Sequence, residues 1–337
     1  MKKMMLLFTG LILSSSATFA ATTINGAGAT FPYPIYSKWF SEFQKTNPEF
    51  QINYQSIGSG GGIRQLLENT IDFGASDAPM TDEQLAKSKT PILHVPTVMG
   101  AVVLTYQVPG IEGELKLNGS IISEIFMGKL TQWNDPKIQK LNPTLKLPAQ
   151  TILVVHRSDG SGTTAIFTDY LSKVSPEWKE KVGAGTAVNW PAGLGGKGNE
   201  GVTGLIKQTP GSIGYVELIY AENNKLPVSL LQNKVGQFIK PTAKSVTSAA
   251  ASVLKNLPAD FRVSITDAEG KDSYPISSFT YLLIHASMEG EKGKALVTFL
   301  NWALKQGQKM AEPMSYAPLP EKMIKKVEAQ VKGIQVK

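Results

Sequence analysis

Hydrophobic side chains recur at helical and at strand-like spacings, in alternation, along the first hundred residues. The first helical stripe, with spacings of three and four residues, comprises Tyr36, Trp39, Phe40 and Phe43. This helix should end near residues 47–48, because the proline at 48 disfavours helical backbone in the residue before it. Thr30 is the expected N-cap, and Pro32 suits the first turn. Residues 50–54 alternate apolar and polar side chains, which predicts a half-buried strand.

The alternation continues beyond that strand. A second helical stripe, after the glycine-rich residues 58–62, comprises Ile63, Leu66 and Leu67. Residues 71–75 are a further strand candidate, and Thr81-Asp-Glu-Gln84 has the form of a capping box. The continuous apolar runs at 98–104 and 151–155 are typical of strands covered on both faces.

Helical spacing returns in the second half of the chain. After Ser161, apolar residues four positions apart are Ile166 with Tyr170 and Phe167 with Leu171. Residues 293–305 predict a late helix with the apolar side chains Ala295, Leu296, Phe299 and Trp302. Residues 191–204 are rich in glycine and are expected to form a loop. Strands that alternate with helices favour an α/β fold, and 337 residues suffice for one large domain or two ordinary ones.

The N-terminus has the regions of a secretory signal peptide, residues 1–20. Lys2 and Lys3 precede an apolar run at 4–13 that is too short to span a bilayer comfortably, and we expect cleavage after Ala20. The chain has no cysteine, so a lipid anchor on a cleavage-site cysteine is excluded, and disulfides are too. We therefore expect a freely diffusing periplasmic protein.

Cleavage would lower the formal net charge from +7 to +5, because it removes Lys2 and Lys3. The remaining lysines are scattered, with local density only near Lys322, Lys325 and Lys326. This distribution favours a solvated surface over a nucleic-acid interface. We expect no nucleic-acid partner and a monomer in solution.

Three glycine-rich segments with hydroxyl side chains stand where helical patterns begin, at residues 26–32, 58–62 and 157–163. Small residues let backbone N–H groups approach a ligand, and the helix dipole makes the N-terminus partly positive. In the third segment Ser161 can cap the helix, and Arg157 suits a pair of phosphate oxygens. An ordinary strand–helix turn with an Arg157–Asp159 pair is the alternative for this segment alone. The three turns together suggest a site for one small anion.

Nucleotide-binding motifs lack support in the sequence. Residues 193–198 superficially suggest a P-loop, but Gly198 stands where Ser or Thr must hold magnesium. The turn at 26–28 lacks the third glycine and the downstream acid of a dinucleotide-binding turn. We expect no cofactor.

Metal and hydrolase chemistry are also disfavoured. The histidines, which are His94, His156 and His285, have no paired spacing and adjoin apolar segments, so we expect no metal site. No Gly-x-Ser-x-Gly elbow follows a strand, although Ser59 comes nearest to one.

Asp77 follows the strand at 71–75 directly and should lie at the same edge of the sheet as the three turns. A carboxylate repels a bound anion unless the anion carries a proton to donate. Inorganic phosphate near neutral pH carries such a proton, whereas sulfate does not. Taken alone, Asp77 could equally be a turn or capping residue.

These segments resemble the periplasmic phosphate-binding proteins of bacterial phosphate ABC transporters. The matching segments are residues 26–34, 54–62, 72–79, 141–147, 159–163, 190–199 and 211–217. The resemblance implies two α/β lobes joined by crossing strands, with phosphate held in the cleft between them. It places lobe I at residues 21–95 plus 276–337 and lobe II at residues 96–275.

The resemblance also implies a ligand set: Thr30, Phe31, Ser59, Asp77, Arg157, Ser161, Gly162 and Thr163. In this set Asp77 accepts the phosphate proton and Arg157 supplies the positive charge. Asp159, which is not itself a ligand, pairs with Arg157. The chain departs from close relatives at His156, where they can carry a second arginine.

The implied function is the capture of inorganic phosphate and its delivery to a membrane ABC permease, which has two transmembrane subunits and a cytoplasmic ATPase. No chemical step is involved, so we expect no enzyme. Two alternatives remain. One is a phosphate-ester hydrolase with Ser59 or Ser161 as nucleophile, and the other is a binding protein for sulfate or molybdate.

Overall fold

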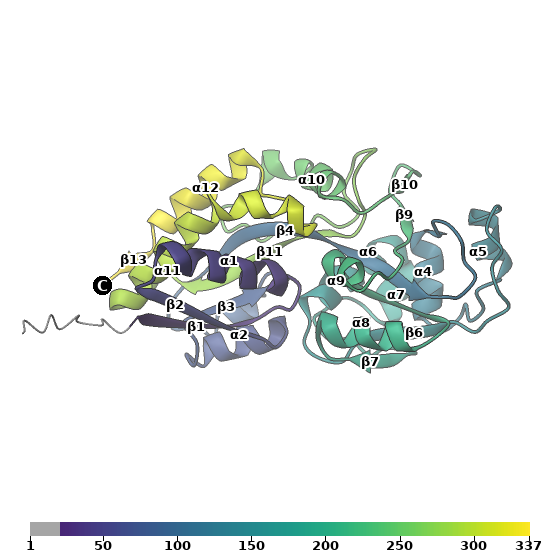
Figure 1. Ribbon diagram of the computed structural model, residues 1–337, viewed down its shortest axis with the longest axis horizontal. Coiled ribbons are helices and arrows are strands. Elements are labelled where there is room, and N and C mark those ends of the chain that lie inside the picture. The colour runs from purple at the N-terminus through teal and green to yellow at the C-terminus, as the bar shows by residue number, and fades with distance from the viewer. Residues whose placement is uncertain (1–20) are drawn as a thin grey trace, which may run out of the picture.

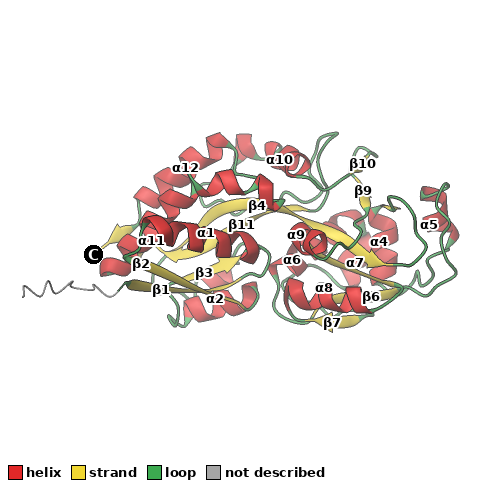
Figure 2. Ribbon diagram, viewed as in Figure 1, coloured by secondary structure: helices red, strands yellow, loops and turns green. Residues whose placement is uncertain are grey.

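The computed structural model describes residues 21–337, so the expected signal peptide at residues 1–20 lies outside the described residues. Within the described part, helices alternate with strands along most of the chain, which confirms the α/β class (Figure 2). None of the helices in residues 21–337 is both long enough and apolar enough to cross a bilayer.

One mixed sheet organises the molecule. Its strands, in spatial order, are β2 (Phe50–Ser56), β1 (Thr22–Gly28), β3 (Phe73–Ser76), β11 (Ser277–His285), β4 (Ile92–Gln107), β8 (Ser212–Glu217), β6 (Leu153–Arg157) and β7 (Leu194–Gly196). A three-stranded sheet comprises β10 (Phe238–Ile239), β9 (Leu230–Gln232) and β5 (Lys116–Leu117), and a two-stranded one comprises β12 (Ser287–Met288) and β13 (Gln335–Val336).

The α-helices are α1 (Tyr33–Thr46), α2 (Ser59–Leu67), α3 (Asp82–Leu85), α4 (Gly119–Phe126), α5 (Pro136–Leu141), α6 (Gly162–Val174), α7 (Pro176–Lys181), α8 (Gly198–Gln208), α9 (Leu218–Asn223), α10 (Ala243–Ala251), α11 (Gly290–Ala303) and α12 (Glu321–Lys332). Short 3₁₀ turns are η1 (Leu254–Asn256), η2 (Gly307–Met310) and η3 (Glu312–Met314). The stripes that predict α1, α2, α6 and α11 are confirmed, and α1 ends at Thr46 as the proline at 48 requires.

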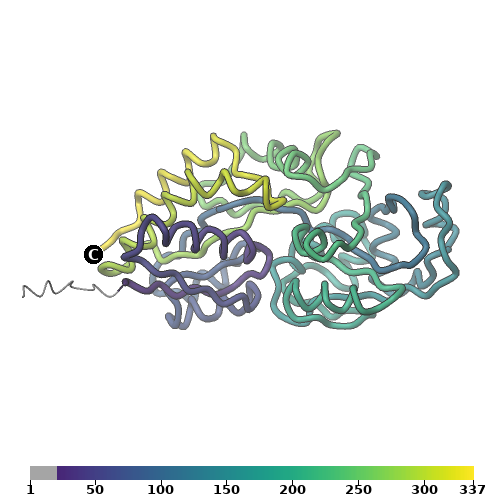
Figure 3. The backbone as a smooth tube through the Cα atoms, viewed as in Figure 1, coloured from purple at the N-terminus to yellow at the C-terminus, as the bar shows by residue number. Residues whose placement is uncertain are grey.

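Strand β4 connects two halves of the sheet. Its residues 92–101 pair antiparallel with β11, and its residues 102–107 pair antiparallel with β8. Strands β1, β2 and β3 are parallel on one side of this strand, and β6, β7 and β8 are parallel on the other. Figures 1 and 3 show that α1, α2, α11 and α12 gather around the first half and α4 and α6–α9 around the second, so N- and C-terminal segments lie together.

The structure corrects three local expectations. Helix α1 begins at Tyr33, and no side chain caps it, so Thr30 is not its N-cap. The apolar run at 151–155 is only partly a covered strand, because β6 begins at Leu153 and the side chain of Leu153 is 40% exposed. The capping box at Thr81, by contrast, is confirmed.

The third correction concerns residues 191–204, which are not a simple loop. They contain β7 and the start of α8, and their glycines allow these two elements to pack closely against each other. A Cβ on Gly196 would lie 2.6 Å from the backbone nitrogen of Val202, so only glycine lets the helix approach the strand this closely.

A buried hydrogen bond joins the two ends of the chain. The indole Nε1–H of Trp39 donates to the carbonyl of Gly307 at 3.0 Å, and the Trp39 side chain is fully buried in the core. We expect Trp39→Phe to lower the free energy of unfolding by about 1–3 kcal/mol, because the ring is largely retained while a buried donor is removed. Urea titration measures this change. The matched control is Trp302→Phe, since Trp302 Nε1 makes no hydrogen bond within residues 21–337, and an equal loss in both variants would contradict the expectation.

Candidate functional site

The expected site residues lie in loops that follow the carboxyl ends of β1, β2, β3 and β6. The carboxyl ends of parallel strands meet at one edge of a sheet, which is where ligand sites form in α/β folds. Two hydrogen-bonded groups, joined by the peptide bond between Gly162 and Thr163, form one cluster. The first comprises Ser59, Asp77 and Gly162, and the second comprises Thr30, Arg157, Asp159 and Thr163, connected through Asn199.

Ser59 starts α2 and links the two halves of the molecule. Its Oγ accepts the backbone N–H of Asp77 at 3.3 Å and the backbone N–H of Gly162 at 3.0 Å. A Cβ on Gly162 would lie 2.5 Å from both Ser59 Oγ and Asp77 Oδ2, so a side chain here would push the halves apart. The start of α6 can therefore approach Asp77 only because residue 162 is a glycine.

Asp77 is a buried carboxylate that is held at one oxygen. Its Oδ1 accepts the hydroxyl of Thr280 at 2.8 Å, and the residue is 2% exposed. Burial raises the pKa of Asp77 to about 7, although the hydrogen bond from Thr280 and the charge of Arg157 act in the opposite direction. The carboxyl therefore titrates close to neutral pH.

Arg157 ends β6 with its side chain 1% exposed. Nε and Nη2 donate to the two carboxylate oxygens of Asp159 at 2.8 and 2.6 Å, and Nη1 donates to Thr163 Oγ1 at 3.3 Å. Burial opposes the ionisation of Asp159, but the hydrogen bond and charge of Arg157 outweigh it and hold the pKa of Asp159 below its usual value. A guanidinium has five N–H groups, so one on Nη1 and one on Nη2 remain available to a ligand.

Thr30 and Thr163 meet at the side chain of Asn199, near the start of α8. Asn199 Nδ2 donates to Thr30 Oγ1 at 2.7 Å and to Thr163 Oγ1 at 3.1 Å, and the backbone N–H of Asn199 also donates to Thr30 Oγ1. All three residues are buried. The Thr30 hydroxyl oxygen thus accepts hydrogen bonds from the start of α8 and does not cap α1.

The hydroxyls of Ser59, Thr30 and Thr163 share one property. Each oxygen accepts two N–H groups, which occupy both of its lone pairs. Only the O–H proton of each remains, so each hydroxyl can act only as a donor. Buried donors that converge with the free N–H groups of Arg157 favour an anion.

Phe31 and Ser161 contribute backbone rather than side chains. The Phe31 ring is fully buried against Tyr316, and the backbone N–H groups of Thr30 and Phe31 make no hydrogen bond within residues 21–337. Ser161 caps α6 as expected, because its Oγ accepts the N–H of Thr164 at 3.0 Å. The N–H of Ser161 donates to the carbonyl of Thr186.

Sequence reasoning missed Thr280 and Asn199. Thr280 lies inside the buried strand β11, and nothing in its local pattern marks a polar role. Asn199 lies in a segment that resembles the family, but its glycine-rich setting suggests only a turn.

His94 and His156 serve structure. His94 Nε2 accepts the N–H of Met80 at 2.9 Å, which helps to hold the loop after Asp77, and His156 stacks on Trp190 with ring centroids 4.8 Å apart. Neither Ser59 nor Ser161 hydrogen-bonds to a histidine in the described chain. Residues 21–337 contain no group of three or more His, Cys, Asp or Glu side chains that could hold a metal.

A cleft of about 620 Å³ reaches Asp77. One wall comprises the loop at 77–81 and Ile63 of α2, and the opposite wall comprises residues 165–169 of α6 and the loop at 184–187. Residues 262–266 close one side. The cleft thus lies between the two halves of the molecule, and Asp77 is the part of the cluster that it reaches.

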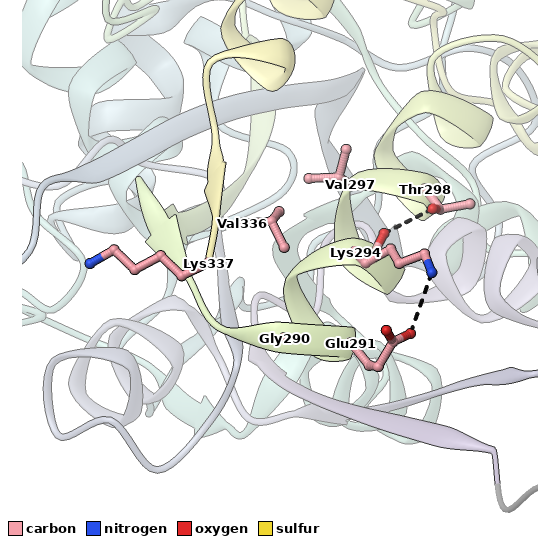
Figure 4. Close-up of a pocket in the computed structure, with 7 residues that line it drawn as sticks. All are labelled: Gly290, Glu291, Lys294, Val297, Thr298, Val336 and Lys337. Carbon is pink, nitrogen blue, oxygen red and sulfur yellow. Dashed lines mark hydrogen bonds and ion pairs between the residues drawn. The ribbon is translucent and has the colours of Figure 1, made fainter.

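A second hollow, of about 330 Å³, lies at the end of the molecule near the C-terminus (Figures 1 and 4). Its side chains belong to α11, β13 and the C-terminal Lys337 and do not converge on a common point. Lys294 pairs with Glu291 at 3.7 Å, and the Thr298 hydroxyl donates to the carbonyl of Lys294 in its own helix. This surface therefore lacks the directed donors of the buried cluster.

Comparisons with known proteins agree with one another. Residues 14–306 match the model of a PBP superfamily domain. The chain is 48% identical to the phosphate-binding protein PstS of Pasteurella multocida over 98% of this chain and 96% of that one, and 45% identical to PstS of Haemophilus influenzae over 93% of each. The structure of a phosphate-binding protein from Stenotrophomonas maltophilia, 17% identical, matches 91% of this chain and 93% of that one with a TM-score of 0.71, which supports the fold.

The pKa of His94 makes stability depend on pH. Burial, with a smaller contribution from the charge of Arg262, lowers the pKa of His94 from 6.5 to about 4. Between these values the unfolded chain binds a proton that the folded protein does not, so stability should fall as pH drops from about 6.5 to about 4. His94→Gln keeps an acceptor for the N–H of Met80 but does not titrate. Its free energy of unfolding should therefore fall less over this pH range than that of the parent, by on the order of 3 kcal/mol at most. Urea unfolding of both proteins from pH 7 to pH 4 measures the difference, and parallel curves would contradict it.

Proposed function

The chain belongs to the PstS family of phosphate-binding proteins within the PBP superfamily, and from this we propose that it captures inorganic phosphate for an ABC-type phosphate import permease. Proteins of this family are binding proteins and not enzymes. The observation that carries the proposal is the set of three buried hydroxyls, Ser59, Thr30 and Thr163, whose lone pairs are all occupied by N–H groups.

Phosphate would be held by hydrogen-bond donors from both halves of the molecule. The backbone N–H groups of Thr30 and Phe31 and the hydroxyls of Thr30 and Ser59 donate from one half. From the other half come the backbone N–H and the hydroxyl of Thr163, at the start of α6. The neighbouring N–H groups of Ser161 and Gly162 donate to the carbonyl of Thr186 and to Ser59 Oγ, and so shape the turn around the anion. The two free N–H groups of Arg157 bind a pair of phosphate oxygens, while Asp159 fixes the guanidinium plane.

Asp77 provides selectivity among oxyanions. Its carboxylate accepts a proton from phosphate, which carries at least one near neutral pH. Sulfate has none to give, so the buried carboxylate must first take up a proton from solvent, which with a pKa of about 7 costs about 1.4 kcal/mol for each pH unit above 7. This corresponds to about one decade of affinity at pH 8 and about two at pH 9.

Binding is coupled to closure of two lobes, lobe I at residues 21–95 plus 276–337 and lobe II at residues 96–275. Two contacts support this coupling, since Ser59 and Thr30 bond to Gly162 and Asn199 from the opposite half. An anion that bonds to donors of both lobes has a higher affinity for the closed state and shifts the equilibrium toward it.

The protein family is periplasmic, and we extend the proposal to this chain's processing and partners. The signal peptide is removed after Ala20, no lipid is attached, and the mature protein is a monomer. Its partner is a permease of two transmembrane subunits with a cytoplasmic ATPase. A phosphate-ester hydrolase is disfavoured because the oxygens of Ser59 and Ser161 accept backbone N–H groups and neither serine has a histidine base. A sulfate or molybdate site is disfavoured by Asp77.

Asp77→Asn tests the selectivity. At pH 8 the parent should bind phosphate and reject sulfate, whereas the variant should bind sulfate at least tenfold more tightly than the parent does, because an amide can donate to a fully deprotonated oxyanion. Isothermal titration with both anions measures this. Asp82→Asn, which removes an exposed carboxylate outside the cluster, is the control. Unchanged sulfate affinity in Asp77→Asn would refute the role of the carboxylate.

A pH series tests the same group independently. Because the pKa of Asp77 is about 7, lowering the pH from 9 to 7 protonates the carboxyl and lets it donate to sulfate. Sulfate affinity of the parent should therefore rise by up to about tenfold per pH unit and level off below pH 7. In Asp77→Asn the affinity for sulfate should not change with pH over this range. A flat profile in the parent would count against the assignment.

A further inference from the structure

Asn199 contacts the hydroxyls of both halves of the cluster while having no place in the ligand set that the sequence implies. It is fully buried near the N-terminal end of α8. Its Nδ2 divides its two N–H groups between Thr30 Oγ1 and Thr163 Oγ1, and its backbone N–H also reaches Thr30 Oγ1. Thr30 comes from the loop after β1, and Thr163 comes from the first turn of α6.

A hydrogen bond on the side facing away from the two threonines fixes the orientation of the Asn199 side-chain amide. Asn199 Oδ1 accepts the backbone N–H of Glu217 at 2.9 Å. Only an oxygen can face that donor, so the amide nitrogen must face the two threonines. The backbone carbonyl of Asn199 is held by the Thr203 hydroxyl at 2.8 Å.

We propose that Asn199 is a positioning residue for phosphate, which aims the hydroxyl protons of Thr30 and Thr163 at the anion. Without its amide, each threonine hydroxyl would have a free lone pair and could rotate its proton elsewhere. With the amide in place, each hydroxyl has a single remaining hydrogen bond to make, and that bond is a donation. Preorganised donors strengthen anion binding because little ordering is left to occur on binding.

The same residue makes this arrangement conditional on closure. Two of its three donated hydrogen bonds to hydroxyls run to Thr30, which belongs to the opposite half of the molecule. When the halves separate, Thr30 loses both donors and its proton is no longer directed. Full donor strength therefore exists only in the closed form, which is where phosphate is held.

The test compares phosphate affinity in variants, and the inference rests on the proposed function. Asn199→Ala should weaken phosphate binding by about 10- to 100-fold, as expected when two hydrogen bonds to a charged group lose their orientation. The matched control is Asn142→Ala. Asn142 is also buried, accepts one backbone N–H at Oδ1 and donates to two oxygens from Nδ2, but it lies outside the cluster. This control should lose stability and keep its phosphate affinity.

A double-mutant cycle with Thr30→Val separates positioning from a general structural role. If Asn199 acts through the threonine hydroxyls, Asn199→Ala should weaken binding at least threefold less in the Thr30→Val background than in the parent. A merely structural effect would be the same in both backgrounds. Should Asn199→Ala fail to fold, Asn199→Asp keeps the shape and the bond from Glu217 but replaces the donor with an acceptor. It should then bind phosphate at least 100-fold more weakly at pH 8.

The outcomes are distinguishable by isothermal titration and thermal unfolding. A parent protein that does not bind phosphate overturns the proposed function together with this inference. A parent that binds, with parent-like affinity in a folded Asn199→Ala or Asn199→Asp variant, overturns the inference alone. Equal losses in the two backgrounds of the cycle also overturn it.

Discussion

The site depends on one property of a hydroxyl group: an oxygen that accepts two N–H groups can afterwards only donate. Ser59, Thr30 and Thr163 all meet this condition, and in each case the N–H donors include groups from a distant segment. The ligand chemistry is thereby decided before any ligand arrives. Because Thr30 takes both of its N–H donors and Ser59 one of its two from the opposite half of the molecule, the anion site is complete only when the halves are together.

Two carboxylates beside this donor array, the buried Asp77 and the partly buried Asp159, behave in opposite ways. Asp159 is paired through both of its carboxylate oxygens with the Nε–Nη2 edge of the Arg157 guanidinium, and its pKa is held low. The ionised form of Asp77 is stabilised only by hydrogen bonds from hydroxyl groups and by the charge of Arg157, which makes no hydrogen bond to it. Burial therefore has the larger effect and raises the pKa of Asp77 to about 7. The first carboxylate orients a cation, and the second remains able to accept or hold a proton. Their different partners, and not their residue type, separate these roles.

Much of the fold could be predicted from local pattern. Apolar spacing gave the positions of α1, α2, α6 and α11, and the capping residues Thr81 and Ser161 were recognisable because their function involves only the next turn. The errors have a common cause. Thr30 is a residue type that commonly caps helices, but its hydroxyl oxygen accepts hydrogen bonds from Asn199, which is 169 positions away. The glycines at 191–204 allow α8 to pack closely on β7 and do not form a simple loop.

Short stretches of sequence are enough to predict the α/β class, the glycine and hydroxyl turns, and the presence of one acidic residue among them, because these features follow from local spacing and residue type. Tertiary structure decided which groups those residues face. The partners of Ser59, Thr30 and Asp77 are Gly162, Asn199 and Thr280, at separations of 103, 169 and 203 residues. Local pattern carries no information about such pairs, since hydrogen-bond direction and burial at these positions arise only when β4 and β11 bring the two halves of the sheet together.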